Sequence, residues 1–265
     1  MHTEQGRSGL WPLLLDSLDA NDGGFRPWGS EEVFPEQMSS PASHDASSLL
    51  ARCWPAYTAA DEDDDDVLDT DRRFAVTASF GQSWPGLAPN RATTTNPDQL
   101  AGESAQEFLA DHPKVRLGLV AAASGAGALA VVGWADPSNY DNDTAKFSTV
   151  VCDWEHRFGA RVVAVGFSTL HLSVDAPPAG AREALLVTAE HFAFCPDNIG
   201  RAAGRTHWPH TLSGLLAPAA ATFGGSEPVR RRPTGNWPTG VRCEGFRRRT
   251  APNRPPTAFP TIAWA

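Results

Sequence analysis

His191 and Cys195 lie four residues apart near the end of a predicted helix, so they share one helical face. A thiol beside an imidazole could act as a nucleophile, with His171 or His191 as the base; alternatively, these side chains and Asp197 could ligate zinc. A helix C-terminus disfavours a thiolate, however, and zinc needs about four ligands, of which one loose pair is visible. We therefore expect Cys195 to be a small core residue and His191 to act as a cation at the helix end.

The other candidates for acid–base chemistry are one strand histidine and two helix carboxylates. His171 alternates with leucines in a predicted strand, which places it on the opposite, partly exposed face. Glu155 and Glu190 fall on separate predicted helices, where we expect both to be solvated charges. A catalytic pair of carboxylates cannot be assigned to them without a measured separation.

A polar loop precedes the helix predicted at 143–158 and holds more polar groups than a simple turn needs. Its residues favour turn and cap structure, with contact to a ligand or protein partner as the alternative. The predicted contact residues are Trp134, Asn139, Tyr140 and Asp143. The loop lacks the glycine and the terminal glutamate of a calcium loop, so no metal site is predicted there.

The glycines of Gly125-Ala126-Gly127 are interpreted as the turn of a β-hairpin, which argues against a phosphate-binding loop. The sequence contains no G-x-S-x-G, Walker A or H-E-x-x-H pattern. No cofactor is predicted.

Hydrophobic periodicity places the elements that would position these residues. Strands are expected at 115–123 and 128–134, joined by the glycine turn, and at 161–167 and 169–174. Amphipathic helices are expected at 143–158, capped by Asn142 or Asp143 and ended by Gly159, and at 181–194. The predicted fold is therefore α+β, with a mostly antiparallel sheet and two main helices packed on one face.

The rest of the chain is divided by composition. Residues 1–99 are interpreted as an N-terminal extension with short helices, one beginning near Trp11 and one capped by Asp45, and with a solvated acidic loop at 61–66. Residues 100–114 are predicted to be a linker, and 115–199 the α+β domain.

The tail at 200–265 differs abruptly from the rest. It contains ten Arg, two Glu, nine Pro and no Asp or Lys, a formal charge of 10 − 2 = +8, against 12 − 29 = −17 for the remainder. We predict it to be disordered.

Whole-chain properties restrict the class of function. The net charge of −9 argues against nucleic acid as a general partner, although arginine triplets in the tail could bind it weakly. The only early apolar run, 10–15, is too short for a signal peptide, and no stretch is long enough to cross a bilayer. The four cysteines are far apart, without a C-x-x-C pair, and are interpreted as reduced thiols of a cytoplasmic protein.

Several separated motifs occur in a recognisable order. They are Gly133-Trp134-Ala-Asp-Pro-Ser-Asn-Tyr-Asp-Asn-Asp-Thr144, Arg157-Phe-Gly-Ala-Arg161, Gly166-Phe-Ser-Thr-Leu-His-Leu-Ser-Val174 and Ala189-Glu-His-Phe-Ala-Phe-Cys-Pro-Asp-Asn-Ile199. With them the chain resembles the bacterial family called domain of unknown function 4253, and Gly9–Leu14 and Arg26–Trp28 resemble the leader of longer members. The resemblance implies a small α/β domain and no particular reaction.

The resemblance ends after Ile199, where members continue with Trp-Gln and a glycine-rich turn. Two interpretations of the tail stay open: an out-of-frame translation after a single-nucleotide change, or a genuine basic tail. Resequencing the gene across Ile199 distinguishes them.

These observations predict a non-catalytic binding protein of the cytoplasm, acting on a protein partner through an acidic surface with nearby aromatic residues. The alternative is an enzyme, or a small-ligand or metal-binding protein, that uses His171, His191 and Cys195. Convergence of those three side chains in one pocket would favour the alternative.

Overall fold

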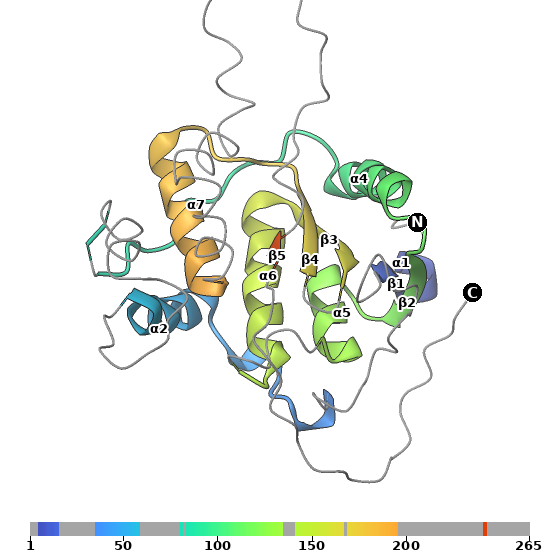
Figure 1. The fold of residues 1–265 in the computed structure, drawn as a ribbon, viewed down its shortest axis with the longest axis horizontal. Coiled ribbons are helices and arrows are strands. Elements are labelled where there is room, and N and C mark those ends of the chain that lie inside the picture. The colour runs from blue at the N-terminus through green and yellow to red at the C-terminus, as the bar shows by residue number, and fades with distance from the viewer. Residues whose placement is uncertain are drawn as a thin grey trace, which may run out of the picture.

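The computed structural model describes residues 5–15, 35–58, 80–81, 83–134, 141–166, 169–195 and 241–242. Its centre is a sheet with the strand order β2-β1-β3-β4-β5 (Figure 1). The β1/β2, β3/β4 and β4/β5 pairs are antiparallel, and only β1/β3 is parallel. The α+β class and the mostly antiparallel sheet are thereby confirmed.

The N-terminal segment supplies an inner strand. β1 (Leu10–Leu15) pairs along its whole length with β2 (Arg116–Ala121), and Leu14 and Leu15 pair with Ala164 and Val165 of β3. The helix expected near Trp11 is therefore wrong, because this continuous apolar run is buried as a strand. Pro12 is tolerated inside the sheet since the pairing with β3 begins two residues later.

The residues after β2 form a helix and not the second strand of a hairpin. α5 (Gly125–Val132) begins at Ser124, whose hydroxyl accepts the N–H of Gly127 at 3.1 Å, and ends at Gly133 in the left-handed region (φ 64°). A serine N-cap and a glycine C-cap thus enclose an alanine-rich run with high helix propensity. The strand expected at 128–134 is wrong for this reason.

The predictions for the next four elements are confirmed. α6 (Thr144–Phe158) begins after Asp143, whose carboxylate accepts the N–H of Ala145, and ends at Gly159 (φ 61°). β3 (Ala160–Val165) and β4 (Thr169–Val174) then form an antiparallel pair, and α7 (Ala181–Phe194) follows. A two-residue strand, β5 (Val241–Arg242), pairs with the start of β4.

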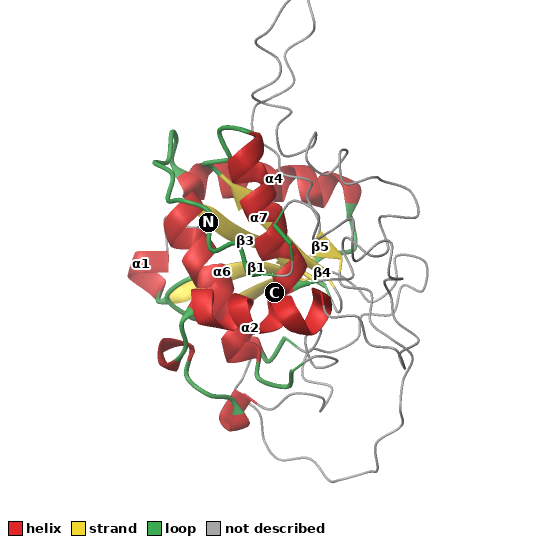
Figure 2. Ribbon diagram, turned by 90° about the vertical axis from the view of Figure 1, so that its left-hand side faces the viewer, coloured by secondary structure: helices red, strands yellow, loops and turns green. Residues whose placement is uncertain are grey.

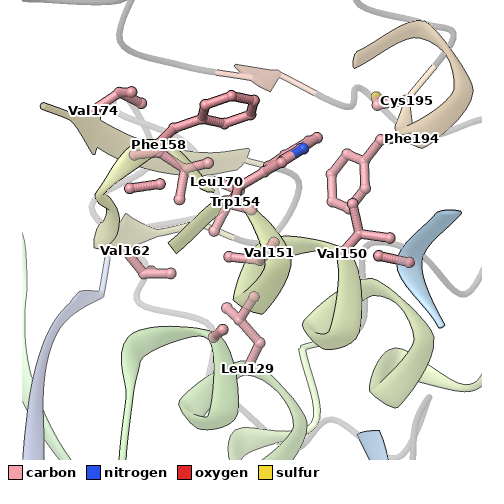
Figure 3. Packing of buried hydrophobic residues seen from close by; sticks show 14 of the residues in the cluster. Leu129, Val150, Val151, Trp154, Phe158, Val162, Leu170, Val174, Phe194 and Cys195 are labelled. Atoms are coloured by element: carbon pink, nitrogen blue, oxygen red, sulfur yellow. The ribbon is translucent and has the colours of Figure 1, made fainter. Parts of the chain in front are cut away.

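The main core lies on the face of the sheet covered by α5 and α6. Trp11, Val162 and Leu170 from the strands pack there with Leu129 of α5 and Val151 of α6. Figure 3 shows this packing around Trp154, which lies between Phe158 and Phe194.

A second helical layer packs outside α6. α2 (Ala46–Thr58) begins at the predicted cap Asp45, which accepts the N–H of Ser48 at 2.8 Å. Its Trp54 is fully buried and meets Phe192 of α7 edge-on, with the ring centroids 5.8 Å apart. Shorter helical turns are α1 (Gln5–Ser8), η2 (Pro35–Gln37) and η3 (Pro41–Ser43).

The opposite face of the sheet is covered by a helix that the sequence interpretation missed. α4 (Pro97–Asp111) packs Ala101 and Phe108 against Leu14, Val163 and Ala164. In Figure 2 the strands lie between α4 and α2. Helices therefore cover both faces, and the prediction that 100–114 is a linker is wrong. Asn96 caps α4 and Pro97 is its first residue, so the start signal was present.

The predicted boundary at residue 99 does not separate two domains, because β1 pairs directly with β2 and β3. The acidic loop 61–66, the position of Ile199 and the tail, apart from Val241–Arg242, lie outside the described residues. No helix in the described ranges is long and apolar enough to cross a membrane.

Candidate functional site

The three residues proposed as an alternative catalytic centre do not converge. His171 lies on β4 and contacts Phe108 and His112 of α4, with ring centroids 4.6 and 6.3 Å away. His191 and Cys195 lie at the end of α7, on the other side of the sheet, where Cys195 is buried in the main core and His191 is half-buried against Trp154. His171 is half-buried.

His191 packs on Trp154, with the ring centroids 5.0 Å apart. Desolvation by burial lowers the pKa of His191 to about 4, so its imidazole is neutral at pH 7. The expectation that His191 is a cation at the helix end is therefore wrong, because burial outweighs the attraction of the helix dipole.

Cys195 is buried in the main core, as expected. It is disulfide-bonded, however, so the expectation of a reduced thiol is wrong at this position. A sulfur in a disulfide has no thiolate to offer as nucleophile or zinc ligand. Cys53 and Cys152 are free thiols.

Glu190 is a buried structural charge and not the solvated one that the sequence suggested. Its side chain is 0% exposed and forms an ion pair with Arg157, with the shortest N–O distance 2.5 Å. The N–H of Ala88 and the indole N–H of Trp154 also donate to its carboxylate, at 2.7 and 2.8 Å. Arg157 additionally donates to Asp153 and to the carbonyl of Ala88. Each carboxylate oxygen of Glu190 already accepts hydrogen bonds, so the group has a structural role.

Glu155 is also not a simple solvated charge. Its Oε1 accepts the N–H of Ala126 at 3.0 Å, in the first turn of α5. Desolvation raises the pKa of Glu155, although hydrogen bonds from Ala126 and Ser124 oppose the shift. The glycine segment 125–127 is the first turn of α5, shortly after β2, so the hairpin argument against a phosphate loop is wrong. Instead, Glu155 places a carboxylate at this helix end, which opposes the binding of another anion.

The structure tests only some of the loop residues that were predicted to contact a ligand or partner. Trp134 is 1% exposed and donates its indole N–H to the carbonyl of Gly166 at 3.2 Å, so it has no surface to offer, contrary to expectation. Asn139 and Tyr140 lie outside the described residues, and their contact with a partner stays a prediction.

Asp143 holds a Ser–His–Asp cluster that the sequence interpretation missed. The hydroxyl of Ser39 lies 2.6 Å from Asp143 Oδ2 and 2.5 Å from His44 Nε2, and the N–H of Ser39 donates to Asp143 Oδ1 at 3.2 Å. His44 Nε2 is itself 3.8 Å from Asp143 Oδ2.

The hydrogen bonding of this cluster differs from that of a catalytic triad. The single hydroxyl proton of Ser39 satisfies the contact with Asp143, so His44 must donate to the Ser39 oxygen. A triad requires the reverse, with the histidine accepting the serine proton and the aspartate bound to the other ring nitrogen. The cluster therefore fastens residues 39–44 to the start of α6.

A pocket of about 390 Å³ lies where β4 ends and α4 begins. We call it the polar pocket; it is lined by Arg91, Ala92, Thr94, Thr95, Gln99, Leu100, Glu103 and residues 174–179. Its volume falls within the range typical of small-ligand sites, about 300–1,000 Å³. The sequence interpretation divided the lining residues among the N-terminal extension, the linker at 100–114 and the α+β domain, so no sequence signal pointed to the pocket.

Asp175 fixes one wall of the polar pocket. The N–H groups of Thr94 and Thr95 donate to its carboxylate at 2.7 and 3.1 Å, and the hydroxyl of Thr95 also donates to it. Burial alone would raise the pKa of Asp175, but these hydrogen bonds outweigh burial and hold it below the ordinary value. Asp175 is therefore an ionised residue that holds the 94–95 backbone in place.

Two charged side chains of the polar pocket keep unused hydrogen-bonding capacity. The guanidinium of Arg91 makes one long contact, from Nη1 to Glu183 Oε2 at 3.4 Å, and its Nε has no hydrogen-bond partner among the described residues. Glu103 accepts from Gln99 through Oε1 at 3.1 Å, and no described group donates to its Oε2. Glu103 Oε2 and the remaining Nη donors of Arg91 can therefore bind further groups, whereas the buried Nε of Arg91 cannot be reached by a ligand.

No group of three or more His, Cys, Asp or Glu side chains within the described ranges could hold a metal ion.

Comparison with known families gives one match. Residues 116–220, which are 105 of 265 residues, match the family model described as "Domain of unknown function (DUF4253)". This segment is similar to the DUF4253 family. The expected resemblance is thus confirmed for this segment, and the matched range extends beyond Ile199. No curated protein and no solved structure matches the chain.

The DUF4253 segment contributes only part of the polar pocket. Residues 174–179 belong to it, whereas Arg91 and the α4 residues precede it.

Proposed function

We propose that this protein is a non-catalytic binding protein and that the polar pocket receives a small polar ligand. The observation that carries the proposal is the contrast between this pocket and the reactive residues. Arg91 and Glu103 retain unused donors and acceptors at a cavity, whereas Glu190 and Asp143 are saturated by structural contacts.

The construction of the pocket supports binding. Asp175 fixes the 94–95 loop, and the N–H of Ala179 donates to Glu183 at 2.8 Å, which holds the opposite loop near Arg91. A wall that is already ordered reduces the entropic cost of binding. Leu100 and the proline pair 177–178 supply apolar surface beside the charged groups.

The proposal is tested by ligand-detected saturation-transfer NMR on the full chain. The probes are amino acids, monosaccharides, nucleoside monophosphates and dicarboxylic acids, each measured separately. We expect at least one class to bind the parent protein and to lose its signal with Ala92→Trp, because an indole at this exposed lining position fills the pocket.

Ala110→Trp is the matched control, because Ala110 is exposed on α4 and does not line the pocket. Its binding signals should equal those of the parent. The bound compound should be recovered unchanged after prolonged incubation. Chemical conversion, or binding that Ala92→Trp leaves intact, would overturn the proposal.

A further inference from the structure

The charges that line the polar pocket define what a ligand must carry. Arg91 is the cation of the lining, and Glu103 and Asp175 are its carboxylates. The carboxylate of Asp175 is occupied by the N–H groups of Thr94 and Thr95 and by the Thr95 hydroxyl. The charges open to a ligand are therefore one positive group, Arg91, and one negative group, Glu103.

Arg91 is suited to bind a carboxylate. A guanidinium carries five N–H donors in a planar fork, and the described contacts of Arg91 use one of them, at 3.4 Å. The side chains of Arg91 and Glu183 are 35% and 28% exposed, so water competes with this weak pair and a ligand carboxylate can join it.

Glu103 is suited to bind an amine. It lies one turn after Gln99 on α4, and the Gln99 amide fixes its Oε1 at 3.1 Å while Oε2 stays available. Leu100 lies between these two residues in sequence and lines the same pocket, with the two prolines 177 and 178. This surface suits an aliphatic group.

We propose that the ligand is a zwitterion with an aliphatic body, of the chemical class of a free branched-chain α-amino acid. Its carboxylate binds Arg91, its ammonium group binds Glu103, and its side chain packs on Leu100 and Pro177. This inference rests on the proposed binding function of the same pocket.

The test is isothermal titration of the full chain with L-leucine, N-acetyl-L-leucine and L-leucinamide. The last two compounds keep only the carboxylate or only the amine, and they also represent the last and the first residue of a peptide. Because a hydrogen bond between charged groups contributes about 1.5–3 kcal/mol, we expect L-leucine to bind at least about ten-fold more tightly than either analogue.

Arg91→Gln and Glu103→Gln should each weaken L-leucine binding by about ten-fold or more. Arg182→Gln and Asp111→Asn are matched controls, because both residues are exposed and neither lines the pocket, and they should bind like the parent. Arg91→Gln should also abolish the preference for L-leucine over L-leucinamide.

Three outcomes contradict the inference. Equal affinity for L-leucine and one analogue would mean that the pocket binds one end of a peptide and not a free zwitterion. A different compound class that binds and is blocked by Ala92→Trp, with no binding of L-leucine, would overturn the zwitterion and leave the proposed function standing. Failure of every class would overturn both.

Discussion

The carboxylate of Glu190 is buried between α6 and α7 and has no exposed surface. Burial of an unpaired charge is costly, and here Arg157, Trp154 and Ala88 together supply the compensating donors. Hydrogen bonds to Glu190 and Asp153 raise the pKa of Arg157 although burial, the largest single effect, would lower it. Removing one member leaves the others without partners.

Glu190→Gln should lower the free energy of unfolding by about 3 kcal/mol, because it leaves the buried Arg157 charge poorly compensated. Urea unfolding followed by circular dichroism measures this change. The matched control is Glu103→Gln. Because the Glu103 carboxylate is exposed, this variant should change the free energy of unfolding by less than about 0.5 kcal/mol. Equal stability of the two variants would show that the buried pair adds nothing.

His191 makes stability depend on pH in a defined direction. Its folded pKa of about 4 lies below the ordinary value of 6.5, so between these values only the unfolded chain takes up the proton. This contribution is complete above pH 6.5 and is lost as the pH falls towards 4, with a loss of about 2 kcal/mol between pH 7 and 5.

His191→Gln should remove that part of the pH dependence, since glutamine does not titrate. The measurement is the difference in unfolding free energy between pH 7 and pH 5 for parent and variant, by urea titration. Identical pH slopes for the two proteins would contradict the lowered pKa of His191.

The individual residue roles were the least predictable from sequence. Glu190 occupies a position on α7 that periodicity alone assigns no partner, and its partner Arg157 is 33 residues away on another helix. Glu155 resembles a surface charge until the turn into α5 brings Ala126 to it. Such roles depend on how the elements pack, which local sequence patterns do not encode.

At the scale of elements, caps decide the boundaries. α6 was predictable because an apolar stripe, an aspartate cap and a terminal glycine agree. α5 was mistaken for a strand because all of its residues are apolar or glycine, so no polar face marks a helical period in the sequence. The serine and glycine caps carried the correct information. α4 was missed since polar residues dominate its sequence.

Gly159→Ala should lower the unfolding free energy by about 2 kcal/mol. Gly159 has φ 61°, and a Cβ there would lie 2.7 Å from the Cγ2 of Thr93. Gly102→Ala is the opposite case, because Gly102 is inside α4 with open space around it, and alanine should stabilise by about 0.5–1 kcal/mol. Thermal unfolding of both variants shows whether each one lowers or raises the stability. A stabilising Gly159→Ala would contradict the left-handed backbone at this position.

At the scale of the whole molecule, the described parts of the chain share one sheet. Local strands such as β3 and β4 could be predicted because they are adjacent in sequence. The pairing of β1 with β3 could not, since sequence patterns do not specify which distant strands meet. The β1/β3 pairing joins the predicted N-terminal extension, 1–99, to the predicted α+β domain, 115–199, in one sheet.

Removal of residues 1–15 should abolish cooperative unfolding, because the loss of β1 separates β2 from β3. A thermal melt followed by circular dichroism measures this, with removal of residues 1–4 as the control that leaves β1 in place. A cooperative melt of the chain lacking 1–15 would show that the rest of the chain folds without β1.

The position of β1 also affects how the chain must fold during synthesis. Leu14 cannot meet Ala164 until 150 further residues have been made. At about 5–20 residues per second, synthesis of these residues takes about 8–30 s, and β3 must then also leave the ribosome before it can pair with β1. During this time the Leu-Trp-Pro-Leu-Leu-Leu segment has no β3 partner, so one side of this apolar strand stays unpaired while the chain is being made.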